Sequence, residues 1–297
     1  DLRAAAAPPP DGGTPSRQAH KSHASTVALV PHPHRDAAAW SALYGLRRRL
    51  GDPGLYRWPP HANLLYPFLR YAERAEDDGG AAEADGTDGG GGGTASPEYD
   101  AAVAALADAV RNLPPVRVTC GGLAIFGKRG GRGGAVLYLD PTERAWTSPP
   151  PPSVAGADPL DVLQRACRDA VPVCTEQRRD KGSELDVFTP HLTVCHYGTY
   201  EEAEEARSAV LSADNSDPGL PPFRLPLIID VEEIYVLRRE GDGGQFEVVA
   251  TLPLEGGRAG GDGPSWHRPP VPFEGMPAAE EEWVLERRME LKARRNR

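Results

Sequence analysis

Two stretches of the chain decide its interpretation: WPPHANLLYPFL at residues 58–69 and FTPHLTVCHYG at residues 188–198. Each contains a histidine after a proline, then one apolar residue and a short polar side chain. The two pairs are His61 with Asn63 and His191 with Thr193. Because side chains alternate across a β-strand, the histidine and the polar residue of each pair share one face. Each stretch therefore predicts a strand that carries an imidazole beside a hydrogen-bonding group, over an apolar back.

Two such strands placed side by side would form a cleft in which two imidazoles face each other. Near neutral pH an imidazole accepts a proton and an imidazolium donates one, so the pair suits phosphodiester chemistry. One histidine would activate the attacking water or hydroxyl, and the other would protonate the leaving oxygen. The Asn63 amide and the Thr193 hydroxyl would hydrogen-bond the phosphoryl oxygens as charge develops there. This chemistry requires no metal and no cofactor.

The rest of the sequence predicts helices alternating with short strands, in the order β-α-β-α-β-β-α-β-α-β-β. Strands are expected at 25–31, 58–69, 116–126, 135–139, 188–197, 223–239 and 246–254, and helices at 36–50, 98–112, 159–173 and 200–212. Such alternation is typical of an α+β or α/β sandwich. Each half holds one histidine strand followed by a helix and a hairpin-like pair of strands. A single His-x-Thr often occurs by chance, whereas two copies in equivalent places favour a paired site.

Glycine and proline are frequent, with 33 and 31 of the 297 residues, and many of them lie outside the expected body of the fold. We expect residues 1–24 to be disordered, 71–97 to be a flexible, acidic, Gly-rich insertion and 143–158 to be a Pro-rich loop. Residues 256–297 are interpreted as a Gly/Pro-rich tail that ends in a short helix. The expected domain is then 25–255, with a compact body of roughly 200 residues.

The formal net charge of −10 argues against a general nucleic-acid coat protein but leaves room for a local basic site. The insertion at 71–97 alone holds seven acidic residues and one arginine, which gives −6 of that total. Four cysteines at irregular spacing form no disulfide framework, and no apolar run reaches the ~20 residues that span a bilayer. The first residues, DLRAAAAPPPDGG, hold no apolar signal core. We therefore expect an intracellular protein, cytoplasmic or nuclear, that is monomeric and has no membrane partner.

The two histidine stretches resemble the signature strands of the 2H phosphoesterase superfamily, within it the 2′-5′ RNA ligase-like or RNA 2′,3′-cyclic phosphodiesterase proteins. The resemblance covers about residues 25–254. It implies a bilobal, duplicated α+β fold in which two antiparallel sheets form a central cleft flanked by helices. It also implies that His61 and His191 are the acid–base pair and that Thr193 binds phosphate. Asn63 stands where the family usually has Thr or Ser, and its amide can still donate a hydrogen bond to phosphate.

The resemblance implies that the chain opens 2′,3′-cyclic phosphates on RNA ends or nucleotides, with reversible 2′-5′ RNA ligation as a related activity. The partner would be an RNA end or nucleotide with a cyclic phosphate, and neither a metal nor a cofactor would be needed. A second hypothesis, suggested by Asn63, is a weakened or inactive module that binds RNA or a nucleotide without turnover. A third is hydrolysis of another small phosphodiester or of 2′-5′ oligoadenylate. The sequence does not assign the acid and base roles.

Further candidates lie outside the two histidine pairs. Lys128, Arg129 and Arg132 belong to the glycine-rich hairpin loop GKRGGRGG, which either touches the phosphates of an RNA end or is a solvated tip. Tyr197 shares the face of His191 by strand alternation, so it either stacks on a base or packs at the edge of the cleft. These four residues are possible substrate-binding residues.

Strand alternation also assigns residues to the opposite face. Tyr66 is expected in the core, and His196 is expected to point away from the cleft, which excludes it from catalysis. Cys195 would share the face of His191, where a cysteine nucleophile is possible on geometry. The histidine and cysteine spacings match no zinc site.

Overall fold

The chain folds around two antiparallel sheets. The computed structural model describes residues 21–71, 95–131, 133–178, 188–212, 223–241, 243–256, 263–278, 281–286 and 289. Most of the disordered segment expected at 1–24, most of the insertion expected at 71–97 and the last eight residues lie outside these ranges. The expected α+β class is confirmed.

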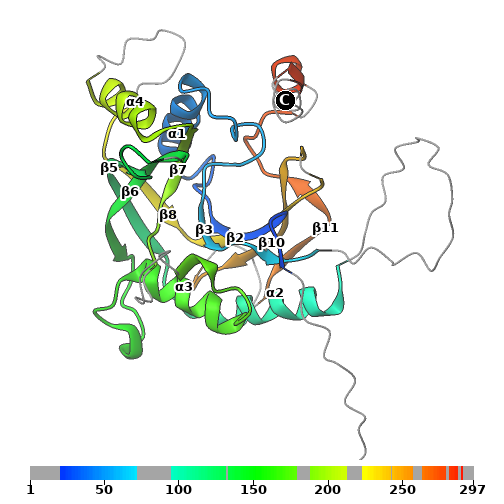
Figure 1. Cartoon of the computed structure of the whole chain (residues 1–297). Helices are drawn as coiled ribbons and strands as arrows, with labels where there is room; N and C mark the ends of the chain where they lie inside the picture. The colour runs from blue at the N-terminus through cyan, green and yellow to red at the C-terminus, as the bar shows by residue number, and fades with distance from the viewer. Residues whose placement is uncertain are drawn as a thin grey trace, which may run out of the picture.

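A five-stranded sheet carries the first histidine strand at its edge. Its order is β11-β10-β9-β2-β3. The strands are β11 (Ser265–Pro272), β10 (Phe246–Pro253), β9 (Glu233–Arg239), β2 (Ser25–Leu29) and β3 (Ala62–Leu65). Helices α2 (Pro97–Val110) and α3 (Pro159–Ala170) pack together and against β10 and β3, and Figure 1 shows both along one side of the sheet.

A four-stranded sheet carries the second histidine strand at its own edge. Its order is β7-β6-β5-β8. The strands are β7 (Leu192–Tyr197), β6 (Ala135–Trp146), β5 (Val116–Phe126) and β8 (Leu227–Val231). Helix α1 (Ala37–Arg49) packs on β7 and β8, and α4 (Tyr200–Ser212) packs on β5, β6 and β7 (Figure 1). The two histidine strands are thus edge strands of different sheets.

Two of the helices begin with strong local signals. Ser96 caps α2 by accepting a hydrogen bond from the amide of Tyr99, and Asp158 caps α3 by accepting from two amides. A proline follows each cap at the first helical position, where its missing N–H costs nothing. Each helix then buries one apolar face, because its leucines and valines recur at helical spacing. These signals explain why the starts of both helices were predicted within one residue, whereas the helices end two and three residues earlier than expected.

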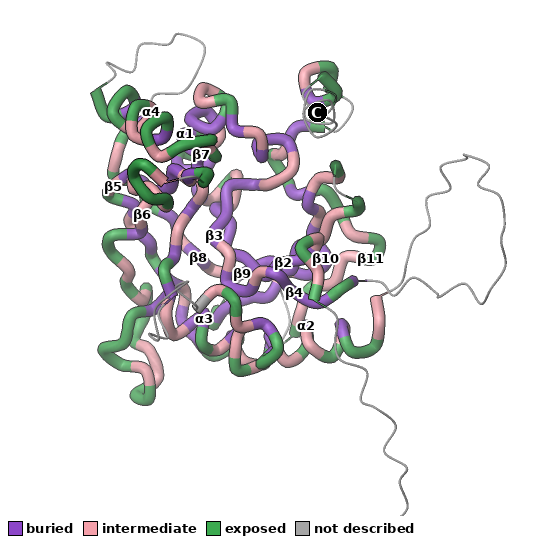
Figure 2. Tube along the Cα trace, in the orientation of Figure 1, coloured by how far each residue is buried: buried purple, intermediate pink, exposed green. Residues whose placement is uncertain are grey.

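One hydrophobic core joins the two sheets. Its buried members come from both of them, including Val27 and Leu64 from the first sheet and Val118, Leu137 and Val194 from the second. Figure 2 shows the buried segments concentrated along the strands that lie between the helices. Because the core is shared, the edge strands β3 and β7 are held in a fixed relation to each other.

The two lobes are not the two halves of the sequence. The chain builds β2 and β3 of the first sheet, then the whole second sheet, and returns to the first sheet for β9, β10 and β11. The single strand expected at 223–239 is wrong, because β8 and β9 lie in different sheets and Glu232 separates them. No glycine or proline lies between β8 and β9, so the apolar pattern of the sequence predicts one continuous strand.

The chain termini contribute strands that the sequence interpretation omitted. The tail expected from 256 forms β11, an edge strand on β10 that contains three prolines, which an edge strand tolerates because one side needs no N–H donors. Near the N-terminus, β1 (Lys21–Ser22) pairs with β4 (Phe68–Leu69), so structure begins before Ser25. A short helical turn follows at 282–286.

Three loop and strand boundaries also differ from expectation. The second half of the 116–146 hairpin continues to Trp146, so the expected loop at 143–158 begins later and contains a 3-10 turn, η1 (Pro152–Val154). The stretch 58–69 divides into β3 and β4 at Tyr66-Pro67. A second 3-10 turn, η2 (Glu176–Arg178), precedes the second histidine stretch, whose strand begins only at Leu192.

Candidate active site

The two predicted histidines occupy matching positions, each directly before its strand. The Nδ1 atom of His61 lies 2.9 Å from the carbonyl oxygen of Pro59, and the Nδ1 atom of His191 lies 2.9 Å from that of Thr189. A carbonyl oxygen only accepts hydrogen bonds, so Nδ1 carries the proton in both neutral rings. Nε2 is then the atom with the free lone pair in each imidazole. The duplication predicted from the sequence therefore extends to the tautomer.

A β-bulge follows the polar residue on the first strand. Ala28 of β2 pairs with Asn63 and the neighbouring Val27 pairs with Leu65, so Leu64 is the extra residue. A bulge interrupts the alternation of side chains, and the residues beyond it change face. Leu64 and Leu65 are both buried, and Tyr66 returns to the side of Asn63. The expectation that Tyr66 lies in the core is therefore wrong.

The second strand repeats this bulge at the equivalent place. Tyr138 of β6 pairs with Thr193 and the neighbouring Leu137 pairs with Cys195, so Val194 is the extra residue. Cys195 is consequently buried, and His196 lies on the side of Thr193.

The prediction that excluded His196 from the cleft is wrong for this reason. Tyr197, placed by simple alternation on the face of His191, is instead partly buried against the core. Burial raises the pKa of the Cys195 thiol to about 11, which disfavours the thiolate form that a nucleophile needs.

A cavity of about 250 Å³ lies between the two histidine strands. Its lining includes three of the predicted residues: His61, Asn63 and Thr193. Residues that the sequence interpretation missed also line it, namely Arg47, Asp52, Arg57, Trp58, Tyr66 and His196. The structure thus brings both motif strands to one hollow.

His191 stands beside this cavity rather than in its lining. Its ring packs edge-on against Phe126, with 4.8 Å between ring centroids, and against Tyr138 at 5.7 Å. Burial lowers the pKa of His191, the Thr189 carbonyl opposes that effect, and the charge of His196 adds to it. The charge of His191 in turn lowers the pKa of His61, so the two imidazoles interact.

His61 is the more deeply buried of the two histidines, with 9% of its surface exposed. Its ring stacks on Trp58, with 4.4 Å between centroids, and Trp58 stacks on Phe246 at 3.5 Å. Burial and the positive charge of Arg47 lower the pKa of His61 to about 3, although the hydrogen bond to the Pro59 carbonyl opposes them. The ring is therefore neutral at pH 7.

Asn63 is held by the neighbouring strand. The hydroxyl of Thr26 donates to Oδ1 of Asn63 over 2.7 Å, so the carbonyl end of the amide is fixed toward β2. The two N–H donors of the amide then lie on the other side of the group, which suits an anionic ligand. The substitution of Asn for the usual Thr or Ser thus keeps a donor in the cavity lining.

A buried ion pair supports the wall of the cavity. Nε of Arg47 lies 2.8 Å from Oδ2 of Asp52, with 3% and 1% of the two side chains exposed, and Arg47 also donates to the carbonyl of Trp58. Burial alone would raise the pKa of Asp52, but hydrogen bonding to His196 and the charge of Arg47 outweigh it, so the pKa lies below its ordinary value. Nδ1 of His196 is 3.7 Å from Oδ1 of Asp52.

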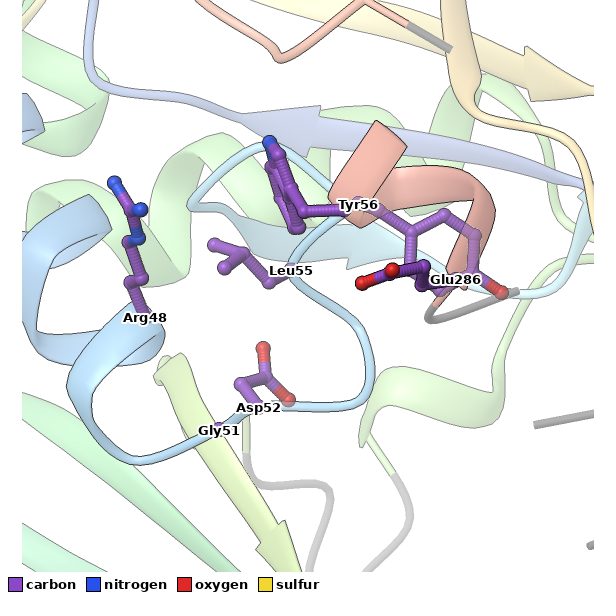
Figure 3. A pocket seen from close by; sticks show the side chains of 7 residues that line it. Arg48, Gly51, Asp52, Leu55, Tyr56 and Glu286 are labelled. Carbon is purple, nitrogen blue, oxygen red and sulfur yellow. The ribbon is translucent and has the colours of Figure 1, made fainter. Parts of the chain in front are cut away.

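Asp52 also borders a second cavity of about 190 Å³. Figure 3 shows its side chain at the base of this hollow, with Arg48 and Glu286 on opposite sides. The C-terminal turn at 282–286 therefore lies against the loop that carries Asp52.

The loop cations are placed apart from the cavity lining. Lys128 and Arg129 follow β5, and the amide of Gly130 donates to Glu201 at the start of α4. The guanidinium of Arg129 lies 5.7 Å from the ring centre of Tyr200. Arg132 lies outside the described residues. That this loop binds substrate stays a prediction.

Within the ranges given above, no helix has the length and apolar character needed to cross a membrane. In the same ranges, no three His, Cys, Asp or Glu side chains are grouped as metal ligands.

Comparison with known proteins supplies the family. The family model described as the 2′-5′ RNA ligase superfamily matches residues 31–243, and the chain belongs to that superfamily. The expected resemblance to the 2H phosphoesterases is thereby confirmed. No curated protein matches the chain. Among solved structures, the apo form of Escherichia coli LigT matches with 16% identity and a TM-score of 0.34, covering 78% of this chain and 95% of that one.

The sequence did contain a signal for the missed residues. In both stretches two apolar residues follow the polar one, Leu64-Leu65 and Val194-Cys195, where strict alternation would place one. Such a doublet is what a bulge produces, because the extra residue and its neighbour both face the core. Arg47 and Asp52 come from the end of α1 and the loop after it, and no pattern in the sequence marked them.

Proposed function

We propose that this protein is a phosphodiesterase that opens 2′,3′-cyclic phosphates on RNA ends or nucleotides by acid–base catalysis with two histidines. The observation that carries the proposal is the matched pair of imidazoles, each locked at Nδ1 by a backbone carbonyl beside a cavity that both motif strands line. Membership of the 2′-5′ RNA ligase superfamily supports a phosphodiester substrate. We propose that neither a metal nor a cofactor takes part.

We assign the base role to His61 and the acid role to His191. His61 has the more strongly lowered pKa, so its Nε2 lone pair is free at neutral pH. An anionic phosphodiester bound in the cavity raises the pKa of an adjacent imidazole. The more exposed His191 then takes a proton from solvent.

In hydrolysis, His61 removes a proton from water as the water oxygen bonds to phosphorus. The bond from phosphorus to one ribose oxygen breaks, and Nε2 of His191 gives that oxygen its proton. Thr193 and Asn63 donate hydrogen bonds to the phosphoryl oxygens as negative charge grows on them. Solvent then resets both rings. With an RNA 5′-hydroxyl in place of water, the same transfers join two ends.

The test uses purified protein and an oligonucleotide that ends in a 2′,3′-cyclic phosphate, assayed in EDTA. We expect hydrolysis with a bell-shaped dependence of kcat/KM on pH. Each of His61→Ala and His191→Ala should lower kcat by about 10²- to 10⁴-fold. His34→Gln, at an exposed histidine outside the cavity, is the matched control and should retain activity. Full activity in the His61→Ala, His191→Ala double variant would overturn the proposal.

A second candidate function is binding without turnover, which the fixed amide of Asn63 favours. Its Oδ1 is tied to Thr26, so the donor that meets phosphate stands elsewhere than a threonine hydroxyl would. The variant Asn63→Thr separates the two readings. A large gain in turnover indicates a weakened enzyme. Tight nucleotide binding with no turnover in either form supports the binding module.

A further inference from the structure

The cavity lining contains the imidazole of His196, which is not part of the proposed acid–base pair. The bulge at Val194 turns His196 onto the face of Thr193, where its half-exposed side chain lines the same cavity. His61 and His196 therefore both line this hollow, and His196 has no role in the proposed acid–base chemistry.

A buried carboxylate, that of Asp52, lies beside Nδ1 of His196. The carboxylate is 1% exposed, is held by Nε of Arg47 and accepts a hydrogen bond from the amide of Gly54 over 3.1 Å. Its Oδ1 lies 3.7 Å from Nδ1 of His196. The carboxylate lies on the Nδ1 side of the ring, so Nε2 is the nitrogen left to meet a ligand on the far side.

His196 stands one step along the strand from the phosphate-binding position. Thr193 and His196 are separated by the bulge, so they act as next neighbours on one face, ~7 Å apart along β7. That spacing exceeds the span of one phosphoryl group and suits the next phosphate along a nucleic-acid backbone. The equivalent position directly after β3 is Tyr66, which offers a phenol ring instead of an imidazole. The two ends of the cavity therefore present different side chains to a substrate.

We propose that His196, oriented by Asp52, binds a second phosphate of the substrate, on the 5′ side of the nucleotide that carries the cyclic phosphate. This inference rests on the proposed function and names its substrate class: a ribonucleotide with a 5′-phosphate or an RNA chain, rather than a nucleoside cyclic phosphate. The second phosphate can come from an RNA backbone or from a terminal 5′-phosphate, and both offer the same anionic oxygens to Nε2.

The test compares three substrates: adenosine 2′,3′-cyclic phosphate, its 5′-phosphorylated form, and the dinucleotide ApA ending in a 2′,3′-cyclic phosphate. A charge-assisted hydrogen bond should raise kcat/KM for the two phosphate-bearing substrates about 10- to 100-fold over the first. His196→Gln should abolish that preference, measured as the ratio of kcat/KM values among the three substrates within the variant. His196→Arg should restore the preference. Equal preference in wild type and His196→Gln would overturn the proposal.

The three-substrate comparison also separates the sources of the phosphate. Equal rates for the 5′-phosphorylated nucleotide and the dinucleotide support recognition of the phosphate alone, and a faster dinucleotide supports RNA. If no substrate is turned over, the proposed function fails, but the binding of adenosine 2′-phosphate and adenosine 2′,5′-bisphosphate still tests His196. By calorimetry, the wild type should bind the bisphosphate about 10-fold more tightly than the monophosphate. His196→Gln should bind the two ligands with the same affinity. Equal affinities would refute the second-phosphate site.

Discussion

Removing one partner of the buried ion pair between Arg47 and Asp52 should lower the stability of the fold strongly. Replacing Arg47 by methionine keeps the length of the side chain but leaves the Asp52 carboxylate without its cation in a nearly waterless setting. The carbonyl of Trp58 also loses the donor that lies 2.7 Å away. Removing one member of a buried ion pair costs about 3–5 kcal/mol. We expect Arg47→Met to lower the free energy of unfolding by that amount at pH 7.

The assay is equilibrium unfolding in guanidinium chloride, read by tryptophan fluorescence, for a complete cycle of variants. Asp52→Asn alone should cost a similar amount, because it leaves a buried guanidinium. The double variant Arg47→Met, Asp52→Asn should cost less than the sum by about 2 kcal/mol or more, because no buried charge is left unpaired. Arg165→Met, which breaks the exposed pair with Asp161, is the control and should cost about 0.5 kcal/mol or less.

The free energy of unfolding should depend on pH in opposite ways in the wild type and in Arg47→Met. In the wild type the pKa of Asp52 lies below its ordinary value, so the pair stabilises the fold above that value and the contribution is lost on acidification. In Arg47→Met, burial without the cation raises the pKa of Asp52, so the penalty should shrink as pH falls from 7 to 4. A loss below 1 kcal/mol in either single variant, or strict additivity in the double variant, would refute this reasoning.

Three further outcomes follow from the same structure. The lowered pKa of His61, from 6.5 to about 3, contributes stability above pH 6.5 that is lost as pH falls toward 3. The wild type should therefore lose up to about 3 kcal/mol more than His61→Asn between pH 7 and 4 in denaturant unfolding, and equal losses would contradict it. Gly275 has a φ of +79° and a Cβ there would lie 2.9 Å from the Trp40 ring, so Gly275→Ala should cost about 1–3 kcal/mol, whereas Gly256→Ala, a positive-φ glycine with open space around it, should cost less. Cys195 should react with a thiol reagent only as fast as the protein unfolds, and rapid labelling of the native protein would show that it is accessible.

The sequence predicted the parts of this fold that local chemistry determines. Helices α2 and α3 begin at a capping residue followed by proline, and β5 carries alternating apolar residues, so their bounds were predicted closely. The two histidine pairs were recognisable because a period of two is a local property. β3 and β7 belong to different sheets, and the whole core places them on either side of one cavity. Only the duplicated motif indicated that the two strands lie close together.

The site residues that were missed depend on events outside a local pattern. His196 and Tyr66 reach the cavity through bulges, which shift the alternation by one residue. Asp52 and Arg47 act through a buried contact between a helix end and a loop, and a sequence of isolated Arg and Asp residues gives no sign of such pairing. The tail strand β11 was missed because its prolines argue against a strand unless the strand is known to lie at an edge.

The central claim is that two imidazoles act on one phosphoryl group, and a crystal structure with adenosine 2′-phosphate bound tests it most directly. We expect the phosphate to lie within hydrogen-bond distance of Nε2 of His61 and Nε2 of His191, with Thr193 and Asn63 donating to its oxygens. A phosphate bound elsewhere on the protein, or held by one of these histidines while the other faces away, would contradict the account.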